Sequence, residues 1–289
     1  MTESHPVAEQ APAAPPPAQG GRAGRDLPAA IGVGLGLGAV VVTTLLAYRP
    51  AFVAIVAVAV GLGLYELVQA LAAGGRRLPL VPLLAGTVAM VAAAYAAGPG
   101  ALAAALAGTV VVVVLWRLTA TDSAYLPDVA ASALAATYVP FLAGFAVLLL
   151  RPANGDLRVI TFIATVVCSD VGGYAAGVLF GRHPMAPTVS PKKSWEGFAG
   201  STVACVLGGI AFLTLLLHGA WWQGALYGLA VVCSATVGDL GESMLKRDLG
   251  IKDMGTLLPG HGGVMDRLDS LLPTAPVAWL LLSTLLPPS

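Results

Sequence analysis

The stretch "RVITFIATVVCSDVGGYAAGVLFG", residues 158–181, carries one charged residue, Asp170, between Val159 and Phe180. A helix that crosses a bilayer needs about 20 mostly apolar residues, because each residue advances about 1.5 Å and the hydrocarbon layer is about 30 Å thick. The stretch is long enough to cross, and its composition suits lipid surroundings. We therefore interpret it as a transmembrane helix.

Apolar runs of this length recur along the whole chain of 289 residues. Hydrophobic residues make up 57% of the chain and charged residues only 10%, unlike a soluble domain of this size. There are nine candidate spans: residues 27–48, 51–73, 79–97, 100–118, 130–150, 158–181, 198–217, 220–240 and 271–287. The sequence predicts an all-α, polytopic integral membrane protein with about nine transmembrane helices.

The basic residues are distributed unevenly between the two sides that these spans define. With a cytoplasmic N-terminus, most of the 15 lysines and arginines fall on the cytoplasmic side: Arg22, Arg25, Arg76, Arg77, Arg117, Arg182, Lys192, Lys193, Lys246, Arg247, Lys252 and Arg267. Only Arg49, Arg151 and Arg158 fall outside. Because cytoplasmic loops carry the excess of basic residues, we expect a multi-pass plasma-membrane protein with a cytoplasmic N-terminus.

The remaining composition sets the domain organisation. Residues 1–26 are rich in Pro, Ala, Gly and Gln, so we expect a disordered cytoplasmic tail there and one transmembrane domain over residues 27–289. The three cysteines lie isolated within predicted spans and indicate neither a disulfide nor a zinc site. A net charge of zero gives no basic excess, so we expect no nucleic-acid partner.

Asp170 belongs to the first of three polar blocks, "CSDVGGYAAG" at residues 168–177. A carboxylate at the centre of a membrane helix costs roughly 2.5–3.5 kcal/mol, so a cation, a basic partner or a water-filled cavity must offset it. Tyr174 lies one turn further along the same face. Either Asp170 is functional, or it holds helices together through hydrogen bonds, and the sequence leaves both interpretations open.

The second block is "SPKKSWEG", residues 190–197. Ser190 followed by Pro191 suits an N-cap and first helical position, so the pattern predicts a helix that begins there. Lys192 and Lys193 would then lie in the first turn, where they oppose the helix dipole unless an anion is bound. We favour a phosphate site over an ordinary basic loop.

The third block runs from "VGDLGESMLKRDLGIKD" to "LPGHGGVMDRLD". In a continuous helix Asp239, Glu242, Ser243 and Lys246 form one polar stripe. The glycines that follow supply a turn with exposed N–H groups, and Asp266 and Asp269 would share a face of the last helix. Carboxylates close to lysines and arginines suggest Mg²⁺ bound together with phosphate, although a salt-bridged loop is the alternative.

Glu66 is the only polar feature of chemical interest in the N-terminal half. An intramembrane carboxylate is a functional hypothesis by default. Glu66 lies close to the expected cytoplasmic end of its span, so we favour the interpretation that it reaches the interface, and its role stays open.

The three blocks together are similar to a known family. The third block resembles the signature of phosphatidate cytidylyltransferases, or CDP-diacylglycerol synthases, in these residues: Ser243, Lys246, Arg247, Lys252, Asp253, Gly255, Leu258, Pro259, His261, Gly262, Gly263, Asp266, Arg267 and Asp269. "SPKKSWEG" is similar to that family's S-P-K-K-T-W-E-G, with Ser194 for threonine. "SDVGGY" resembles its S-D-T-G-A-Y, with Val171 and Gly173 as departures. The motifs cover residues 160–270, where we expect the chemistry to concentrate.

The resemblance implies a Mg²⁺-dependent nucleotidyltransferase of phospholipid biosynthesis. It would convert CTP and phosphatidic acid to CDP-diacylglycerol and pyrophosphate, by in-line attack of the lipid phosphate on the α-phosphorus of CTP. The site would face the cytoplasm and the bilayer, and a homodimer is plausible.

We assign roles as hypotheses. The expected catalytic residues are Asp239, Asp266, Lys246, Arg267 and His261. The expected substrate-binding residues are Ser190, Lys192, Lys193, Glu196, Arg247, Lys252, Gly262, Gly263 and Asp269. The expected metal ligands are Asp239 and Asp266, with Asp170 as a third ligand or the ligand of a second cation.

Other functions fit the sequence less well. A transporter would need polar residues that reach both faces, and almost no charge lies on the outer side. A cytidylyltransferase for another lipid phosphate and a CTP-dependent lipid kinase remain open, because no motif identifies the lipid. A CDP-alcohol phosphotransferase would need a denser run of aspartates than "DRLD" supplies.

Overall fold

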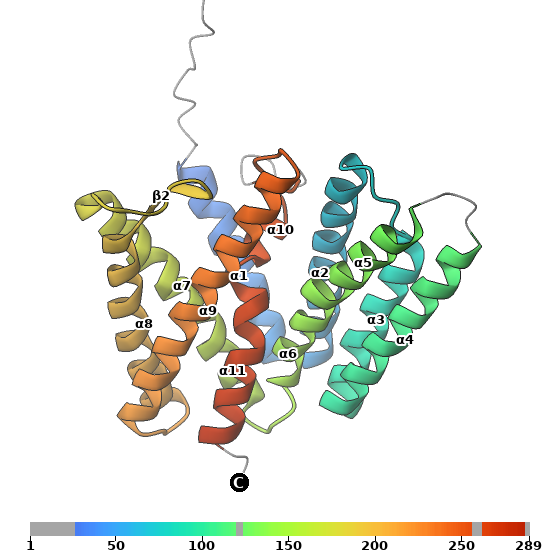
Figure 1. Cartoon of the computed structure of the whole chain (residues 1–289). Helices are drawn as coiled ribbons and strands as arrows, with labels where there is room; N and C mark the ends of the chain where they lie inside the picture. The colour runs from blue at the N-terminus through green and yellow to red at the C-terminus, as the bar shows by residue number, and fades with distance from the viewer. Residues whose placement is uncertain (1–26, 120–123, 256–261, 287–289) are drawn as a thin grey trace, which may run out of the picture.

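The computed structural model describes residues 27–119, 124–255 and 262–286 (Figure 1). The predicted tail, residues 1–26, and the candidate His261 lie outside these ranges. In chain order the elements are α1 (Leu27–Ala47), α2 (Arg49–Ala73), α3 (Leu80–Ala97), α4 (Pro99–Leu118), α5 (Tyr125–Ala136), the π-helical turn η1 (Thr137–Phe141), α6 (Leu142–Leu148), α7 (Gly155–Phe180), β1 (Pro184–Ala186), β2 (Ser190–Ser194), α8 (Trp195–Leu216), α9 (Trp221–Asp248), α10 (Met265–Leu268) and α11 (Leu271–Leu285).

The helices have the length and composition of membrane spans. Within the described ranges, eight helical segments of 18–28 residues are apolar enough to cross a bilayer, with α5–η1–α6 and α10–α11 each counting as one. The first predicted span coincides with α1, which is 21 residues long. The predicted all-α, polytopic membrane fold is confirmed, and the protein is a multi-pass membrane protein.

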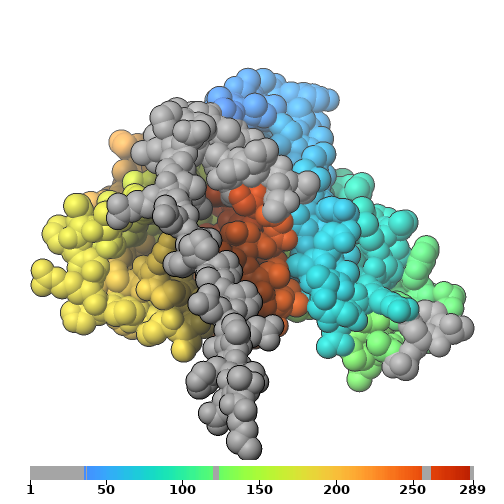
Figure 2. Space-filling view, turned by 90° about the horizontal axis from the view of Figure 1, so that it is seen from above, coloured from blue at the N-terminus to red at the C-terminus, as the bar shows by residue number. Residues whose placement is uncertain are grey.

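The bundle has two ends, which we name here for later use. The hairpin end carries β1, β2 and α10, and the far end is where α11 finishes (Figure 1). Seen from the hairpin end, the red-orange chain of α10 and α11 lies between the yellow chain around β1 and β2 and the cyan helices of the N-terminal half (Figure 2). These two helices therefore lie between the two halves of the bundle, while α9 packs against α8 and α11.

The predicted start of α8 is wrong by four residues. Residues Ser190–Ser194 form strand β2, which pairs with β1, and the helix begins at Trp195. Ser194 is the N-cap, because its hydroxyl accepts a hydrogen bond of 3.1 Å from the N–H of Gly197. A proline is tolerated in an edge strand, so Pro191 fits the hairpin as well as it fits a helix start. Lys192 and Lys193 thus lie on a strand.

Helices α7, α8 and α9 pack with their backbones in close contact. A Cβ atom added to Gly172 would lie 2.8 Å from the carbonyl oxygen of Gly200, and one added to Gly228 would overlap the carbonyl of Cys205. The hydroxyl of Ser201 donates to the carbonyl of Ser169 at 2.7 Å. Small residues at helix interfaces allow such packing in membranes. These three helices form a tight unit that fixes the positions of the side chains between them.

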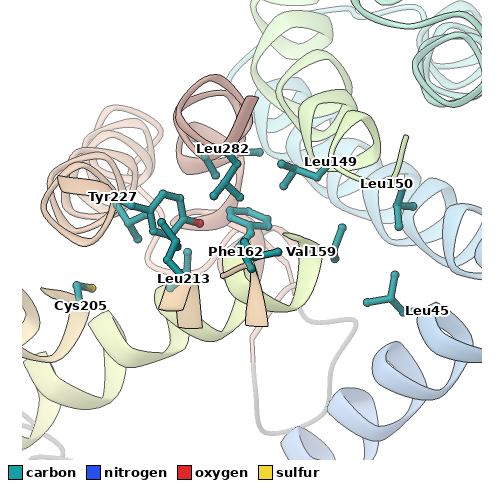
Figure 3. Close-up of a cluster of buried hydrophobic side chains, with 14 of the residues drawn as sticks. Leu45, Leu149, Leu150, Val159, Phe162, Cys205, Leu213, Tyr227 and Leu282 are labelled. Carbon is teal, nitrogen blue, oxygen red and sulfur yellow. The ribbon is translucent and has the colours of Figure 1, made fainter. Parts of the chain in front are cut away.

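A buried apolar cluster joins this unit to the rest of the bundle (Figure 3). Leu45 of α1, Leu149 beside α6, Phe162 of α7, Tyr227 of α9 and Leu282 of α11 are all nearly or fully buried in it. Close van der Waals packing of this kind is a main source of stability between membrane helices. The cluster makes α11 a common partner of both halves.

At the hairpin end of the bundle, a buried ion pair holds together elements of the N-terminal half. Arg117 of α4 contacts Asp128 of α5 at 2.6 Å, and Asp128 also accepts a 3.0 Å hydrogen bond from the N–H of Arg77. Asp128 is fully buried. This carboxylate ties together α4, α5 and the loop that precedes α3.

The far end holds the three arginines that the sequence placed outside. Arg158 is buried and donates to the carbonyls of Leu282 and Leu286 at 2.9 and 2.5 Å, where α11 ends. Arg49 donates to the carbonyl of Ala153 at 2.6 Å and pairs with Asp156 at 3.1 Å. Arginines near helix C-termini satisfy carbonyls that have no partner within the helix.

Candidate active site

A cavity of about 310 Å³ opens between α7, α8, α9 and β2. Asp170, Tyr174, Lys192, Lys193, Asp239 and Ser270 line it. All three polar blocks therefore contribute to one cavity, as the sequence predicted. The cavity combines carboxylates from membrane helices with lysines from the hairpin.

Charges of both signs meet in this cavity. The ammonium of Lys193 lies 2.5 Å from a carboxylate oxygen of Asp239, and both side chains are partly exposed. Asp170 lies close enough to Asp239, Asp269, Lys193 and Arg267 to interact with their charges. Cations in a partly open cavity suit an anionic ligand, and the carboxylates suit a cation that arrives with it.

A second group of charged residues, along α9, is more buried in the protein than the Lys193–Asp239 pair. Lys246 contacts Glu242 at 3.0 Å and Asp266 at 2.9 Å, and Glu242 is fully buried. The predicted polar stripe is confirmed, since Asp239, Ser243 and Lys246 follow one face of α9. Glu242 was not among the predicted site residues. Its place in that stripe was the signal that could have identified it.

Asp266 is held by the chain itself. One oxygen accepts from the N–H groups of Gly263 at 2.8 Å and Met254 at 3.1 Å, and the other contacts Lys246. Asp266 is not among the residues that line the cavity. Its carboxylate instead ties α9 and α10 to the segment that joins them, the α9–α10 connection.

Two residues separate α10 from α11. α10 ends at Leu268, and α11 begins at Leu271 after a turn in which Asp269 accepts a 2.6 Å hydrogen bond from the N–H of Ser270. Asp269 and Ser270 keep right-handed helical backbone angles, so α10 and α11 continue as one segment of membrane-spanning length. That Asp266 and Asp269 share a face of this segment stays a prediction. Gly262 has φ +80°, a left-handed conformation that favours glycine, as expected for a turn.

Two predicted substrate-binding residues hold the hairpin in place. Glu196 accepts hydrogen bonds from the N–H groups of Arg182 and His183 and contacts the His183 ring. Arg247 donates to the carbonyl of Val189 at 3.3 Å, between the two strands. Both residues therefore stabilise the hairpin that carries Lys192 and Lys193. Ser190 begins β2 beside them and does not line the cavity.

The remaining candidates lie around the α9–α10 connection. Lys252 and Arg267 are exposed, and Gly263 is buried against Asp266. Glu66 was expected to reach the membrane interface, and this interpretation is wrong. It is only 3% exposed, and it accepts a 2.8 Å hydrogen bond from the N–H of Met265.

The carboxylates of the cavity fit Mg²⁺ only if substrate phosphates and water complete its coordination shell. Across the part of the chain that the structure describes, no three His, Cys, Asp or Glu side chains are arranged to hold a metal ion. Asp170 and Asp239 nevertheless line the same cavity beside two lysines. Mg²⁺ is typically bound by one or two carboxylates and completes its shell with waters and substrate phosphates. The two aspartates meet that requirement.

Fold and site together describe a membrane protein with a charged cavity that suits an anionic ligand. A sequence profile described as the Cytidylyltransferase family matches residues 28–285, and the chain belongs to this family. The predicted family is thereby confirmed, and the protein is a nucleotidyltransferase.

Several relatives carry the name phosphatidate cytidylyltransferase. The protein of Mycobacterium bovis is 48% identical over 285 residues, which cover 94% of this chain and 93% of the relative. That of Mycobacterium leprae is 47% identical over 285 residues, covering 92% and 90%. A Brucella suis relative is 39% identical over 145 residues, or 48% of this chain and 54% of the relative.

Proposed function

We propose that this protein transfers a cytidylyl group from CTP to phosphatidate and forms CDP-diacylglycerol and pyrophosphate. The observation that carries the proposal is the cavity in which Lys192 and Lys193 face Asp170 and Asp239. The names of the relatives support this choice of substrates. The lipid acceptor lies at the membrane, and the site is built from membrane helices.

The chemistry needs no nucleophile from the protein. An oxygen of the phosphatidate phosphate attacks the α-phosphorus of CTP in line. The new P–O bond forms as the bond to the β-phosphate breaks, and pyrophosphate leaves with the electron pair. Phosphoryl-type transfer of this kind depends mainly on positioning and on the stabilisation of charge. The charged groups of the cavity supply both.

Lys192 and Lys193 bind phosphate oxygens in this mechanism. Lys193 pairs with Asp239 in the structure. When CTP binds, a phosphate oxygen takes the place of this carboxylate, so Lys193 keeps an anionic partner and loses little free energy. Asp170 and Asp239 would hold Mg²⁺, which neutralises phosphate charge when bound. The sequence predicted Asp266 as a metal ligand. Here it is assigned a structural role in holding the α9–α10 connection, because its oxygens accept hydrogen bonds from Lys246, Met254 and Gly263.

We also propose that the hairpin end faces the cytoplasm of the cell in which the protein resides. Lys192, Lys193 and Lys246 all lie toward this end, while Arg49 and Arg158 of the far end are engaged by carbonyls. CTP is a soluble, anionic nucleotide, so the open face of the cavity must reach the compartment that holds it.

The test is an assay of the purified protein in mixed micelles with labelled CTP, Mg²⁺ and phosphatidate. We expect label to enter the lipid with release of pyrophosphate, and both to disappear with EDTA or with Asp170→Asn. Asp156→Asn is the matched control, because it alters a carboxylate of the far end and should leave the rate unchanged.

Transfer to other lipid phosphates but not to phosphatidate would keep the chemistry and reject the acceptor. Phosphorylation of a lipid alcohol by CTP would favour the lipid kinase that the sequence left open. No transfer to any lipid would contradict the proposed function.

A further inference from the structure

Glu66 lies in the N-terminal half, yet its carboxylate contacts the α9–α10 connection. Its Oε2 accepts a hydrogen bond of 2.8 Å from the N–H of Met265, the first residue of α10. The two residues are 199 positions apart in the sequence. Within the described ranges the other oxygen, Oε1, is buried and accepts no hydrogen bond. A buried carboxylate in a membrane protein is costly, so its retention here points to a role.

Two glycines of the connection are packed directly against this carboxylate. A Cβ atom added to Gly255 would overlap Oε1, and one added to Gly263 would lie 2.5 Å from Oε2. Gly63 lies one turn before Glu66 on α2, and a Cβ there would be 3.1 Å from Leu268 of α10. The connection and α10 therefore pack closely against the face of α2 that carries Gly63 and Glu66.

The connection is also tied to α9, through Asp266. Asp266 accepts hydrogen bonds from Met254 and Gly263, and Lys246 of α9 contacts the same carboxylate. The carboxylates of Glu66 and Asp266 thus accept hydrogen bonds from N–H groups at both described ends of the connection. Lys246 continues this network to Glu242, one turn from Asp239 in the cavity.

We infer that Glu66 is a positioning residue: it holds Gly255, Gly263 and Met265, at the described ends of the α9–α10 connection, against α2. In this way it fixes the network of Asp266, Lys246 and Glu242, which lies one turn from Asp239 of the cavity. The inference rests on the proposed function for its effect on turnover. Glu66 contacts neither Asp170 nor the lysines that line the cavity, so it acts through the connection and not on the substrate.

The experiment compares Glu66→Ala with Glu66→Gln in the full-length protein. A displacement of about 1 Å that starts far from the reacting atoms costs on the order of 100-fold in rate, so we expect kcat to fall about 100-fold in Glu66→Ala while KM for CTP stays close to that of the wild type. Glutamine keeps a carbonyl oxygen that can accept from Met265, and it should retain about ten times more turnover than alanine.

Hydrogen–deuterium exchange gives a readout that does not depend on activity. We expect faster exchange in peptides spanning residues 254–265 of Glu66→Ala and unchanged exchange in α7 and α8. Asp128→Asn is the matched control. It also alters a buried carboxylate of the N-terminal half, but Asp128 contacts Arg117 and Arg77 rather than the connection. It should lower the unfolding temperature and leave both kcat and exchange over residues 254–265 unchanged.

A double mutant tests whether Glu66 and Gly255 act together. Gly255→Ala should lower kcat because the new methyl group displaces the Glu66 carboxylate. Glu66→Ala makes room for that methyl group, so the double mutant should be about as active as Glu66→Ala alone rather than showing the product of two losses.

Wild-type turnover in Glu66→Ala, or unchanged exchange over residues 254–265, would overturn the inference. So would an equal loss of kcat in Asp128→Asn, because stability alone would then explain it. If the wild-type protein transfers nothing from CTP, the proposed function fails, and the exchange measurement alone decides whether Glu66 holds the connection.

Discussion

The two ends of the bundle use their basic residues in different ways. At the far end, Arg49 and Arg158 donate to main-chain carbonyls where helices and turns finish. At the hairpin end, Lys193 and Lys246 pair with carboxylates. A main-chain carbonyl is a fixed partner, because the fold holds the backbone that carries it in place. A carboxylate partner can be exchanged for a phosphate. Arg49 also has a carboxylate partner, Asp156, but it does not line the cavity, whereas Lys193 of the hairpin end does.

The comparison predicts its largest effect at Lys246. Lys246→Met leaves the buried Glu242 and the carboxylate of Asp266 without their cation. Removal of one partner of a buried ion pair costs about 3–5 kcal/mol, so thermal unfolding in detergent should show a loss of that order. Lys252→Met, at an exposed lysine of the same end, is the control and should change little. Equal stability of the two variants would show that the deeper network does not hold this end together.

Asp239→Asn should affect rate more than stability. Asp239 is partly exposed in the cavity, and its loss removes a charge that faces the substrate. Loss of one preorganised electrostatic contact lowers kcat about 10²–10³-fold in other enzymes, and we expect a similar fall in the micelle assay. A variant that is inactive because it unfolds would instead show a lower unfolding temperature.

Arg158→Met should give the reverse result. The substitution removes two hydrogen bonds from a buried guanidinium to the end of α11, and bonds to a charged group contribute about 1.5–3 kcal/mol each. We expect a lower unfolding temperature with kcat unchanged at 25 °C. A fall in kcat without a change in stability would mean that the far end takes part in the reaction.

The smallest effect is expected at Arg49. About a third of this side chain is exposed, and so is a similar part of its partner Asp156. Exposed pairs contribute roughly 0.2–1 kcal/mol, so Arg49→Gln should shift the unfolding temperature only slightly. Raising the salt concentration should weaken the pair in the wild-type protein and reduce the difference.

Much of this architecture could be predicted from the sequence, because bilayer thickness fixes the length of an apolar run. The meeting of Asp170, Lys193 and Asp239 was also predictable from their motifs. The start of α8 was not, because Ser190 and Ser194 are both good N-caps, and pairing with β1 decides between them.

Long-range contacts explain what the sequence could not show. Glu66 was assigned to the interface because its sequence neighbourhood shows only its depth in the membrane. Its partner, Met265, lies 199 residues away. The assignment of Asp266 to a metal stays a prediction. Nothing in "MDRL" reveals that its carboxylate also accepts hydrogen bonds from the N–H groups of Met254 and Gly263.

The π-helical turn at Thr137–Phe141 sets the rotational phase of the helix that precedes it. A π-helical turn, with hydrogen bonds between residues five apart, takes up one residue more than an α-helical turn. Loss of one residue from this turn would therefore turn it into an α-helical turn and leave Asp128 facing Arg117 and the N–H of Arg77. The turn thus accommodates a difference of one residue, and related chains can keep this ion pair with one residue fewer between Asp128 and α6.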